Sequence, residues 1–440
     1  STGTAFANIG VIVIDDATKK IESNSLFEIK EDTAKDATVA AAAQKIIDRI
    51  DKEYGAVFAK SEVVLNGAKA PNGNRDSETN NGDLITDAMV WKILQDKESL
   101  TVDADHVVAI TNGGGIRAAI KPGDVTKKDI NTVLPFGNTV AVIYVTGAEL
   151  LEALEASTYS LPVGGFPQVS GINYTISTAV AYDANAETYP ASTYYGPKSI
   201  NRVTINSING KEFKADDTYA VITNDFCGGG GDTYYAFAAA TAKFDTGIPL
   251  DEVVMEYITA ELKGVIGKQY AAPQGRILMN PFADVKASSW FGKYVIDLYN
   301  DGIINGTSAT TYAPNNTLTW AAALKLLLVS NGDLKAADAT GADWSKNAIA
   351  KAAELGLVAA DLDGAKAISR LEFCQVAAKL NKLAESKTES KFTDCTDGYV
   401  MALVDAKVIS GMTETTFEPA ASLTRAQIAK ILYQLTLIEK

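Results

Sequence analysis

A repeated segment in the last third of the chain is the feature that most constrains its fold. The tetrapeptide Phe282-Ala-Asp-Val returns as Phe392-Thr-Asp-Cys, 110 residues later. A longer segment beginning at Thr311 returns at Thr416, 105 residues later, so one copy carries a five-residue insertion. A weaker third copy lies between them and ends near Ile368. Because such a small helical unit cannot bury its apolar face alone, the three copies should pack against one another.

The chain before residue 280 has a different pattern. From about residue 63 to 279, short apolar strands such as Val107–Ile110 and Val140–Val145 alternate with helices such as Gly147–Ala156. This alternation is typical of a mixed α/β domain. The sequence therefore predicts an α/β domain with a mixed sheet, followed by an all-α module.

Two smaller elements precede this domain. Residues 1–35 are β-rich around a polar turn at Asp15-Asp16, and two or three strands alone need a partner surface to bury both faces. Residues 36–62 contain a helical pattern in which Val39, Ile46 and Ile50 share one side. We expect this segment to be a connecting helix.

The charge and hydropathy of the chain exclude several classes of partner. The 440 residues carry a net charge of −14. Binding to nucleic acid relies on Lys and Arg to displace counterions, so this balance argues against a nucleic-acid partner. No apolar run approaches about 18 residues, so no membrane span is predicted. The N-terminus also lacks the pattern of an intact signal peptide.

Histidine and cysteine are scarce. The single histidine, His106, cannot build a two-metal hydrolase centre, and we expect it to have a surface or hydrogen-bonded role. The three cysteines form no zinc motif. Cys374 and Cys395 could form a disulfide in an exported protein, and three free thiols are the equal alternative. No metal site is predicted in this chain.

Several loop segments carry candidate binding residues. In Thr111-Asn-Gly-Gly-Gly-Ile-Arg117 the glycines let backbone N–H groups approach a ligand, and Arg117 offers a forked donor for oxyanions. A plain turn is the alternative. Phe136 and Phe226 lie beside glycines, where two rings could bracket a flat base, each contributing about 1–3 kcal/mol. Asp232 follows four glycines and could accept hydrogen bonds from ribose hydroxyls.

Together these segments resemble the C-terminal, substrate-binding domain of the 5′-nucleotidases over residues 60–275. Five motifs occur in family order: Glu78-Thr-Asn-Asn-Gly-Asp, Thr111-Asn-Gly-Gly-Gly-Ile-Arg117, Leu134-Pro-Phe-Gly-Asn138, Gln168-Val-Ser-Gly171, and Asn224-Asp-Phe through Asp232. The resemblance implies a nucleobase between the two phenylalanine rings, with the ribose at Asp232. It implies that ribose and phosphate bind Arg75 and Arg117, and that the base pocket is lined by Asn112, Asn138 and Gly171.

The catalytic parts of that family lie elsewhere. Its two divalent metals and its His-containing dyad belong to an N-terminal metallophosphoesterase domain, and residues 1–35 resemble the last strands of that domain. The resemblance therefore implies no catalytic residue, metal or cofactor in this chain. It makes an associated phosphoesterase chain an expected partner. A precursor cut into two associated chains would explain the arrangement, as would a fragment.

The repeats resemble S-layer homology modules, which anchor bacterial surface proteins to cell-wall polymers, at about 280–331, 332–385 and 386–440. The family's Thr-Arg-Ala-Glu-like tetrapeptide appears as Ser369-Arg-Leu-Glu and Thr424-Arg-Ala-Gln, and each can form a helix capping box. Arg370 and Arg425 have no role in that cap, so we expect them to be free to pair with an acidic sugar. The first copy has Trp320 at this place. Asp284 and Asp394 either shape the polymer-binding groove that the resemblance implies or have turn or helix-cap roles.

Two functions follow from these patterns. The first is the nucleotide-recognising part of an extracellular 5′-nucleotidase, a nucleoside monophosphate phosphohydrolase, anchored to a bacterial cell wall. Its partners would be a nucleotide or nucleoside, an acidic wall polysaccharide and the phosphoesterase chain. Alone, it should bind nucleoside monophosphates weakly and hydrolyse nothing. The alternative is a structural S-layer protein that reuses the scaffold without catalysis.

Overall fold

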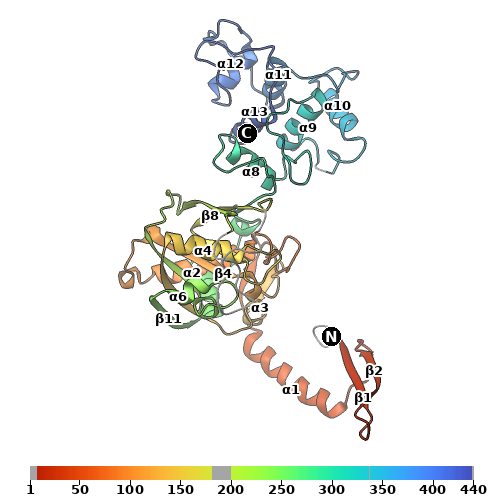
Figure 1. Cartoon of the computed structure of the whole chain (residues 1–440), viewed down its shortest axis with the longest axis vertical. Helices are drawn as coiled ribbons and strands as arrows, with labels where there is room; N and C mark the ends of the chain where they lie inside the picture. Colours follow the sequence, from red (N-terminus) through yellow and green to blue (C-terminus); the bar gives the residue numbers. More distant parts are fainter. Residues whose placement is uncertain (1–6, 181–199, 336, 439–440) are drawn as a thin grey trace.

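The computed structural model describes residues 7–180, 200–335 and 337–438. Figure 1 shows a hairpin and a long helix at one end, an α/β domain in the middle and a helical module at the other end. None of the helices in the described part of the chain has the length and apolar character needed to cross a bilayer. The predicted fold class, mixed α/β followed by an all-α module, is confirmed.

The N-terminal end is a hairpin followed by helix α1. Strands β1 (Asn8–Ile14) and β2 (Ile21–Glu28) pair antiparallel. Helix α1 (Ala37–Tyr54) begins after Asp36, whose carboxylate accepts the backbone N–H groups of Thr38 and Val39. No residue of α1 is buried, and every residue of β2 is exposed. Within the described chain, these elements therefore have no core of their own.

A five-stranded sheet in the order β11-β6-β10-β4-β7 forms the centre of the α/β domain. Strand β10 runs parallel to β4, and the other pairs are antiparallel. Two three-stranded sheets, β12-β3-β5 and β13-β8-β9, complete the domain. The strands of the central sheet are β4 (Val107–Asn112), β6 (Thr139–Thr146), β7 (Pro167–Ser170), β10 (Thr218–Asn224) and β11 (Ala242–Pro249). Those of the smaller sheets are β3 (Val57–Ser61), β5 (Gly123–Thr126), β8 (Ile172–Ser177), β9 (Val203–Ile208), β12 (Val265–Ile266) and β13 (Ile277–Asn280).

Helices cover both faces of the central sheet. Alternate residues of β4 serve different cores: Val107 and Ala109 pack with α2 and α7, whereas Val108 and Ile110 pack with α4 and α6. Because both faces are buried, β4 is a continuous apolar run in the sequence. The helices of this domain are α2 (Asn80–Leu94), α3 (Lys127–Val133), α4 (Gly147–Ser157), α5 (Asp225–Gly228), α6 (Tyr235–Ala239) and α7 (Leu250–Ala260).

The helical module contains two helices from each repeat copy and one shared apolar core. Isolated β-bridges join the copies in a ring: Thr319 to Ala367, Ser369 to Ser422, and Thr317 to Thr424. The third copy thus returns to the first, which confirms that the copies pack against one another. Its helices are α8 (Gly292–Asn300), α9 (Trp320–Asn331), α10 (Trp344–Glu354), α11 (Arg370–Leu380), α12 (Gly398–Asp405) and α13 (Arg425–Thr436).

Candidate functional site

The parallel pairing of β4 and β10 places the candidate binding loops at one edge of the central sheet. Both strands end at this edge, β4 at Asn112 and β10 at Asn224. The loops that follow surround a cavity of about 740 Å³. The cavity brings together seven of the eight predicted residues: Arg75, Asn112, Arg117, Phe136, Asn138, Phe226 and Asp232.

Two phenylalanine rings line this cavity and remain open to solvent. Phe136 is 62% exposed and Phe226 is 50% exposed, although large apolar side chains are normally buried. The ring of Phe226 lies close over Gly231, because a Cβ there would lie 2.5 Å from the ring and push it aside. The sequence therefore provides two open aromatic faces at one cavity, a surface suited to a flat ligand.

A chain of hydrogen bonds holds the acidic residue of the cavity. Asn112 donates from Nδ2 to Oδ2 of Asp232 at 2.7 Å. Asn224 donates from Nδ2 to Oδ1 of Asn112 at 3.0 Å. Oδ1 of Asn224 accepts the backbone N–H of Cys227 at 2.8 Å, which caps α5. Asp232 itself has a left-handed φ of 53°. The network connects β4, α5 and Asp232.

Two arginines line the same cavity. Arg117 lies with Cζ 5.6 Å from the ring centroid of Phe136 and donates from Nη1 to the carbonyl of Gly114 at 3.1 Å. The main chain of Arg75 is fixed on both sides, since its N–H donates to Lys69 and its carbonyl accepts the N–H of Val163. These two cations favour an anionic ligand.

The eighth predicted residue lies elsewhere. Gly171 is absent from the cavity lining and connects β7 to β8 with a φ of +77°. A Cβ there would lie 3.2 Å from the carbonyl of Val107, at the opposite end of β4 from Asn112. The predicted base-pocket role is therefore corrected to a turn role. Its motif partner Gln168 is also structural, because it accepts the N–H of Thr79 at 2.9 Å.

Other lining residues were missed in the sequence. The wall also includes Tyr159, Val163, Gly164, Asp225 and Thr233. Asp225 and Thr233 adjoin the recognised Phe226 and Asp232 in sequence, and that adjacency is the signal that could have revealed them. Cys227 is buried, and burial raises the pKa of its thiol, with the charge of Asp232 acting in the same direction. It is therefore no activated nucleophile.

The described residues contain no group of three or more His, Cys, Asp or Glu side chains that could hold a metal ion. His106 has the hydrogen-bonded role that was expected, because its ring nitrogens contact Asp105 at 2.6 Å and Asp217 at 3.3 Å. Cys374 and Cys395 are free thiols, as is Cys227. The predicted alternative of free cysteines is the one that the structure shows.

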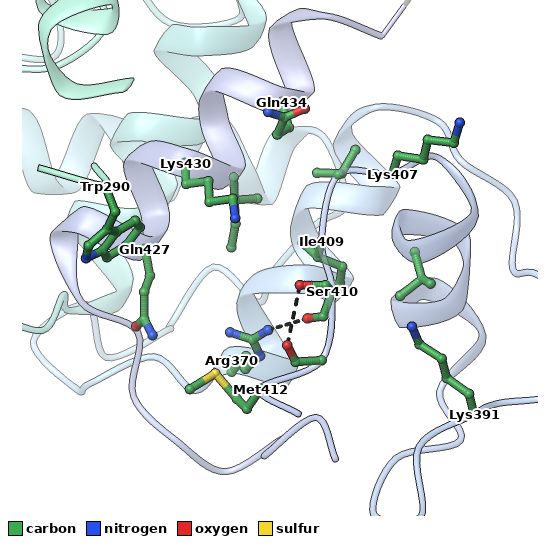
Figure 2. A pocket seen from close by; sticks show the side chains of 14 residues that line it. Trp290, Arg370, Lys391, Lys407, Ile409, Ser410, Met412, Gln427, Lys430 and Gln434 are labelled. Carbon is green, nitrogen blue, oxygen red and sulfur yellow. Dashed lines mark hydrogen bonds between the residues drawn. The ribbon is translucent and has the colours of Figure 1, made fainter. Parts of the chain in front are cut away.

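A second cavity, of about 550 Å³, lies in the helical module (Figure 2). Its wall combines Trp290 of the first copy, Arg370 of the second, and a larger part of the third copy. The charged lining residues are all cationic: Arg370, Lys391, Lys407 and Lys430. Trp290 is 59% exposed. We name this cavity the cationic groove.

The expectation that both repeat arginines are free was wrong. Arg370 is only 7% exposed and donates from Nη2 to the carbonyl of Ser410 at 2.8 Å. Arg425 donates from Nε to the carbonyl of Tyr312 at 2.7 Å and from Nη2 to that of Asn305 at 2.8 Å. Each guanidinium therefore joins its copy to the next, and burial lowers the pKa of both. Only Arg370 lines the cationic groove.

The two repeat aspartates hold turns. Asp284 accepts the backbone N–H groups of Tyr312 and Ala313 at 2.8 and 2.7 Å. Asp394 accepts those of Phe417 and Glu418, both at 2.8 Å. Of the two roles considered, the turn role is the one observed. Both predicted capping boxes are confirmed, at Ser369 with Glu372 and at Thr424 with Gln427.

Comparison with protein families assigns both regions. Residues 57–239 match the model of the 5′-nucleotidase C-terminal domain. Residues 281–323 and 394–429 match the S-layer homology domain. The weaker middle copy of the repeat lies between these two matches.

Individual relatives agree with these matches. The trifunctional nucleotide phosphoesterase protein YfkN of Bacillus subtilis is 34% identical over 278 residues, which is 62% of this chain and 17% of YfkN. The 5′-nucleotidase of Vibrio cholerae is 27% identical over 59% of this chain and 41% of its own length. The cell wall protein Lmo0130 of Listeria monocytogenes is 32% identical over 38% of this chain and 19% of that protein.

Among solved structures, the 5′-nucleotidase precursor of Thermus thermophilus aligns with a TM-score of 0.46 and 28% identity, over 62% of this chain and 50% of that one. The chain thus spans less than half the length of the three relatives named above and half of this structure. Within this chain, residues 57–239 thus correspond to a 5′-nucleotidase C-terminal domain, followed by S-layer homology domains between residues 281 and 429.

Proposed function

We propose that this chain is the nucleotide-recognising and wall-anchoring part of a cell-surface 5′-nucleotidase. The observation that carries the proposal is the convergence of seven predicted residues, from separate loops, on one cavity. In this proposal the nucleobase stacks between Phe136 and Phe226, and Asp232 accepts the ribose hydroxyls. Arg75 and Arg117 hold the 5′-phosphate through charge-assisted hydrogen bonds.

Hydrolysis in this proposal belongs to a separate metallophosphoesterase half. That half would supply two divalent metals and a metal-activated hydroxide. Support comes from the N-terminal hairpin, where Ile12 is 56% exposed on one face and Ile9 is 53% exposed on the other. Strands that are apolar on both faces normally lie inside a larger domain. The phosphoesterase half is the partner that we propose for this surface.

The helical module would attach the protein to the wall of a bacterium. S-layer homology domains and the similarity to a Listeria cell wall protein support this location. The cationic groove has no acidic lining residue and has an exposed indole at Trp290. An acidic polysaccharide would match the groove, because its charge would meet Lys and Arg and a sugar ring could lie against the indole.

Nucleotide binding can be tested by calorimetric titration of AMP into the full chain. We expect weak binding and no release of phosphate when divalent metal is added. Phe226→Ala should weaken binding about 5- to 150-fold, because one base–ring contact contributes about 1–3 kcal/mol. The matched control is Phe244→Ala, which removes an exposed ring on β11 outside the cavity. Equal affinity in all three proteins would contradict the proposal and favour a purely structural surface protein.

A further inference from the structure

Asn224 is a buried polar residue that is not among the residues predicted to contact the ligand. Its side chain is 2% exposed and makes hydrogen bonds at both ends. Nδ2 donates to Oδ1 of Asn112 at 3.0 Å and to Oγ1 of Thr111 at 3.1 Å. Oδ1 accepts the N–H of Cys227. Asn224 thus connects the ends of β4 and β10 beneath the cavity.

The backbone N–H of Cys227 sets the orientation of both side-chain amides in this network. A backbone N–H can only donate, so the N–H of Cys227 must face the oxygen of Asn224. The amide nitrogen of Asn224 then faces Asn112, which must present its own oxygen. Asn112 is left with its nitrogen toward Asp232. Each amide orientation therefore follows from the preceding one.

We infer that Asn224 is a positioning residue for ribose recognition: it fixes the amide orientation of Asn112 and so holds the Asp232 carboxylate as an acceptor. This inference rests on the proposed nucleotide binding. Within the described residues, Oδ1 of Asp232 accepts no hydrogen bond, so it is available to a hydroxyl. Gly164 keeps that side open, because a Cβ there would lie 3.6 Å from Oδ1.

One substitution separates this role from the structural role of Asn224. In Asn224→Asp, one carboxylate oxygen still accepts the N–H of Cys227, and Asp is as good a helix cap as Asn. Phe226 should therefore keep its place on α5. The other oxygen cannot donate to Asn112, whose amide must lose this bond or rotate. Rotation would turn an oxygen toward Asp232, and the resulting repulsion would displace the carboxylate.

The chain offers a matched control at Asn206. Its Nδ2 donates to Oδ1 of Asn173 at 2.8 Å and to Oγ1 of Thr175 at 3.0 Å, the same pair of acceptor types. Asn206 is outside the cavity lining. Asn206 is exposed, unlike Asn224, so Asn206→Asp tests the same substitution and the same pair of acceptors away from the binding site, without burying the new carboxylate.

The test compares adenosine with 2′,3′-dideoxyadenosine by calorimetry on the full chain. The second ligand keeps the base and lacks both ribose hydroxyls, and neither carries a phosphate for the arginines. Wild type and Asn206→Asp should prefer adenosine. Asn224→Asp should bind adenosine about tenfold to hundredfold more weakly, the range for a lost hydrogen bond to a charged group. Its affinity for dideoxyadenosine should be unchanged.

The outcomes separate the two levels of the argument. Failure of wild type to bind either nucleoside would overturn the proposed function and this inference with it. Preference for adenosine in wild type that persists in Asn224→Asp would overturn the inference alone. Equal weakening of both nucleosides in Asn224→Asp would show that the residue only supports the loops, which also overturns it. Thermal unfolding of both variants reports whether they are folded.

Discussion

At the scale of single residues, the arginines of the helical module show how one residue type can have two roles. Arg370 reaches the wall of the cationic groove, whereas Arg425 does not. Arg425 is tied to two carbonyls of the first copy, and its Cζ lies 4.4 Å from the ring centroid of Tyr312. Its guanidinium therefore closes the ring of copies, and the lysines of the groove remain open to a ligand.

We predict that two substitutions on α13 affect different properties, one the stability of the helical module and the other its binding to wall material. Arg425→Ala should destabilise the helical module by about 2–4 kcal/mol, because two charged hydrogen bonds are lost and two carbonyls lose their partner. Lys430→Ala, at an exposed groove position, should change stability by less than about 0.5 kcal/mol. The same Lys430 variant should be retained less by purified bacterial wall material. Urea unfolding and a wall sedimentation assay measure the two effects, and similar stability of both variants would contradict the assignment.

The residues that were misjudged share a physical cause. Motif order indicated the cavity ligands, and the loops that carry Arg117 and Phe226 each follow a recognisable strand. The partners of Arg425 lie 113 and 120 residues away, so no local pattern could reveal them. Gly171 lies in a recognised motif, yet its turn points toward the far end of β4. Contacts between distant segments decide what such residues do.

At the scale of elements, the first turn of α2 contains a buried carboxylate. Asp83 is fully buried, and its Oδ1 makes no hydrogen bond within the described residues. Its Oδ2 accepts the N–H of Gln274 at 3.1 Å. The nearest guanidinium nitrogen of Arg276 is 3.6 Å from Oδ1. Burial raises the pKa of Asp83 to about 8, and the nearby charge of Glu78 acts in the same direction.

This carboxylate should make the α/β domain less stable as the pH rises. The pKa of Asp83 is higher in the folded state than its ordinary value of 3.8, so between about pH 4 and 8 the folded state holds a proton that the unfolded state has released. The stabilisation from protonated Asp83 is therefore complete below about pH 4, and it is lost progressively as the pH rises to about 8. In Asp83→Asn the pH slope should be smaller, because the amide is neutral throughout.

Thermal unfolding of the α/β domain at pH 5, 6.5 and 8 measures this effect. The control is Asp124→Asn on β5, which removes an exposed carboxylate and should leave the slope as in wild type. Between pH 5 and 8 the unfolding temperature of wild type should fall more than that of Asp83→Asn. An equal fall in both proteins would contradict the assignment.

At the scale of the whole molecule, the hairpin differs from the rest of the chain. One face of the hairpin carries Ile12, Ile14 and Leu26, which are 56%, 55% and 59% exposed. The other face carries Ile9 and Phe27, which are also exposed. The sequence could predict these strands and their need for a partner, because β1 is apolar on both faces and two or three strands alone cannot bury both faces. It could not place them, since within the described chain they pack on no other element.

Charged substitutions on the hairpin should therefore change association and leave the folded domains intact. In Ile12→Asp with Leu26→Asp, both replaced side chains are more than half exposed and lie outside the α/β core. The free energy of unfolding of the α/β domain should therefore change by no more than an ordinary surface substitution does, about 0.5 kcal/mol. Self-association of the chain at high concentration should decrease, because exposed apolar patches drive it. Sedimentation velocity and thermal unfolding measure both quantities. The contrasting variant is Val108→Asp, which introduces a charge into the core between β4 and α4 and should unfold the domain. If the hairpin variant unfolds as Val108→Asp does, the hairpin is packed within this chain, and the surface proposed for the phosphoesterase half does not exist.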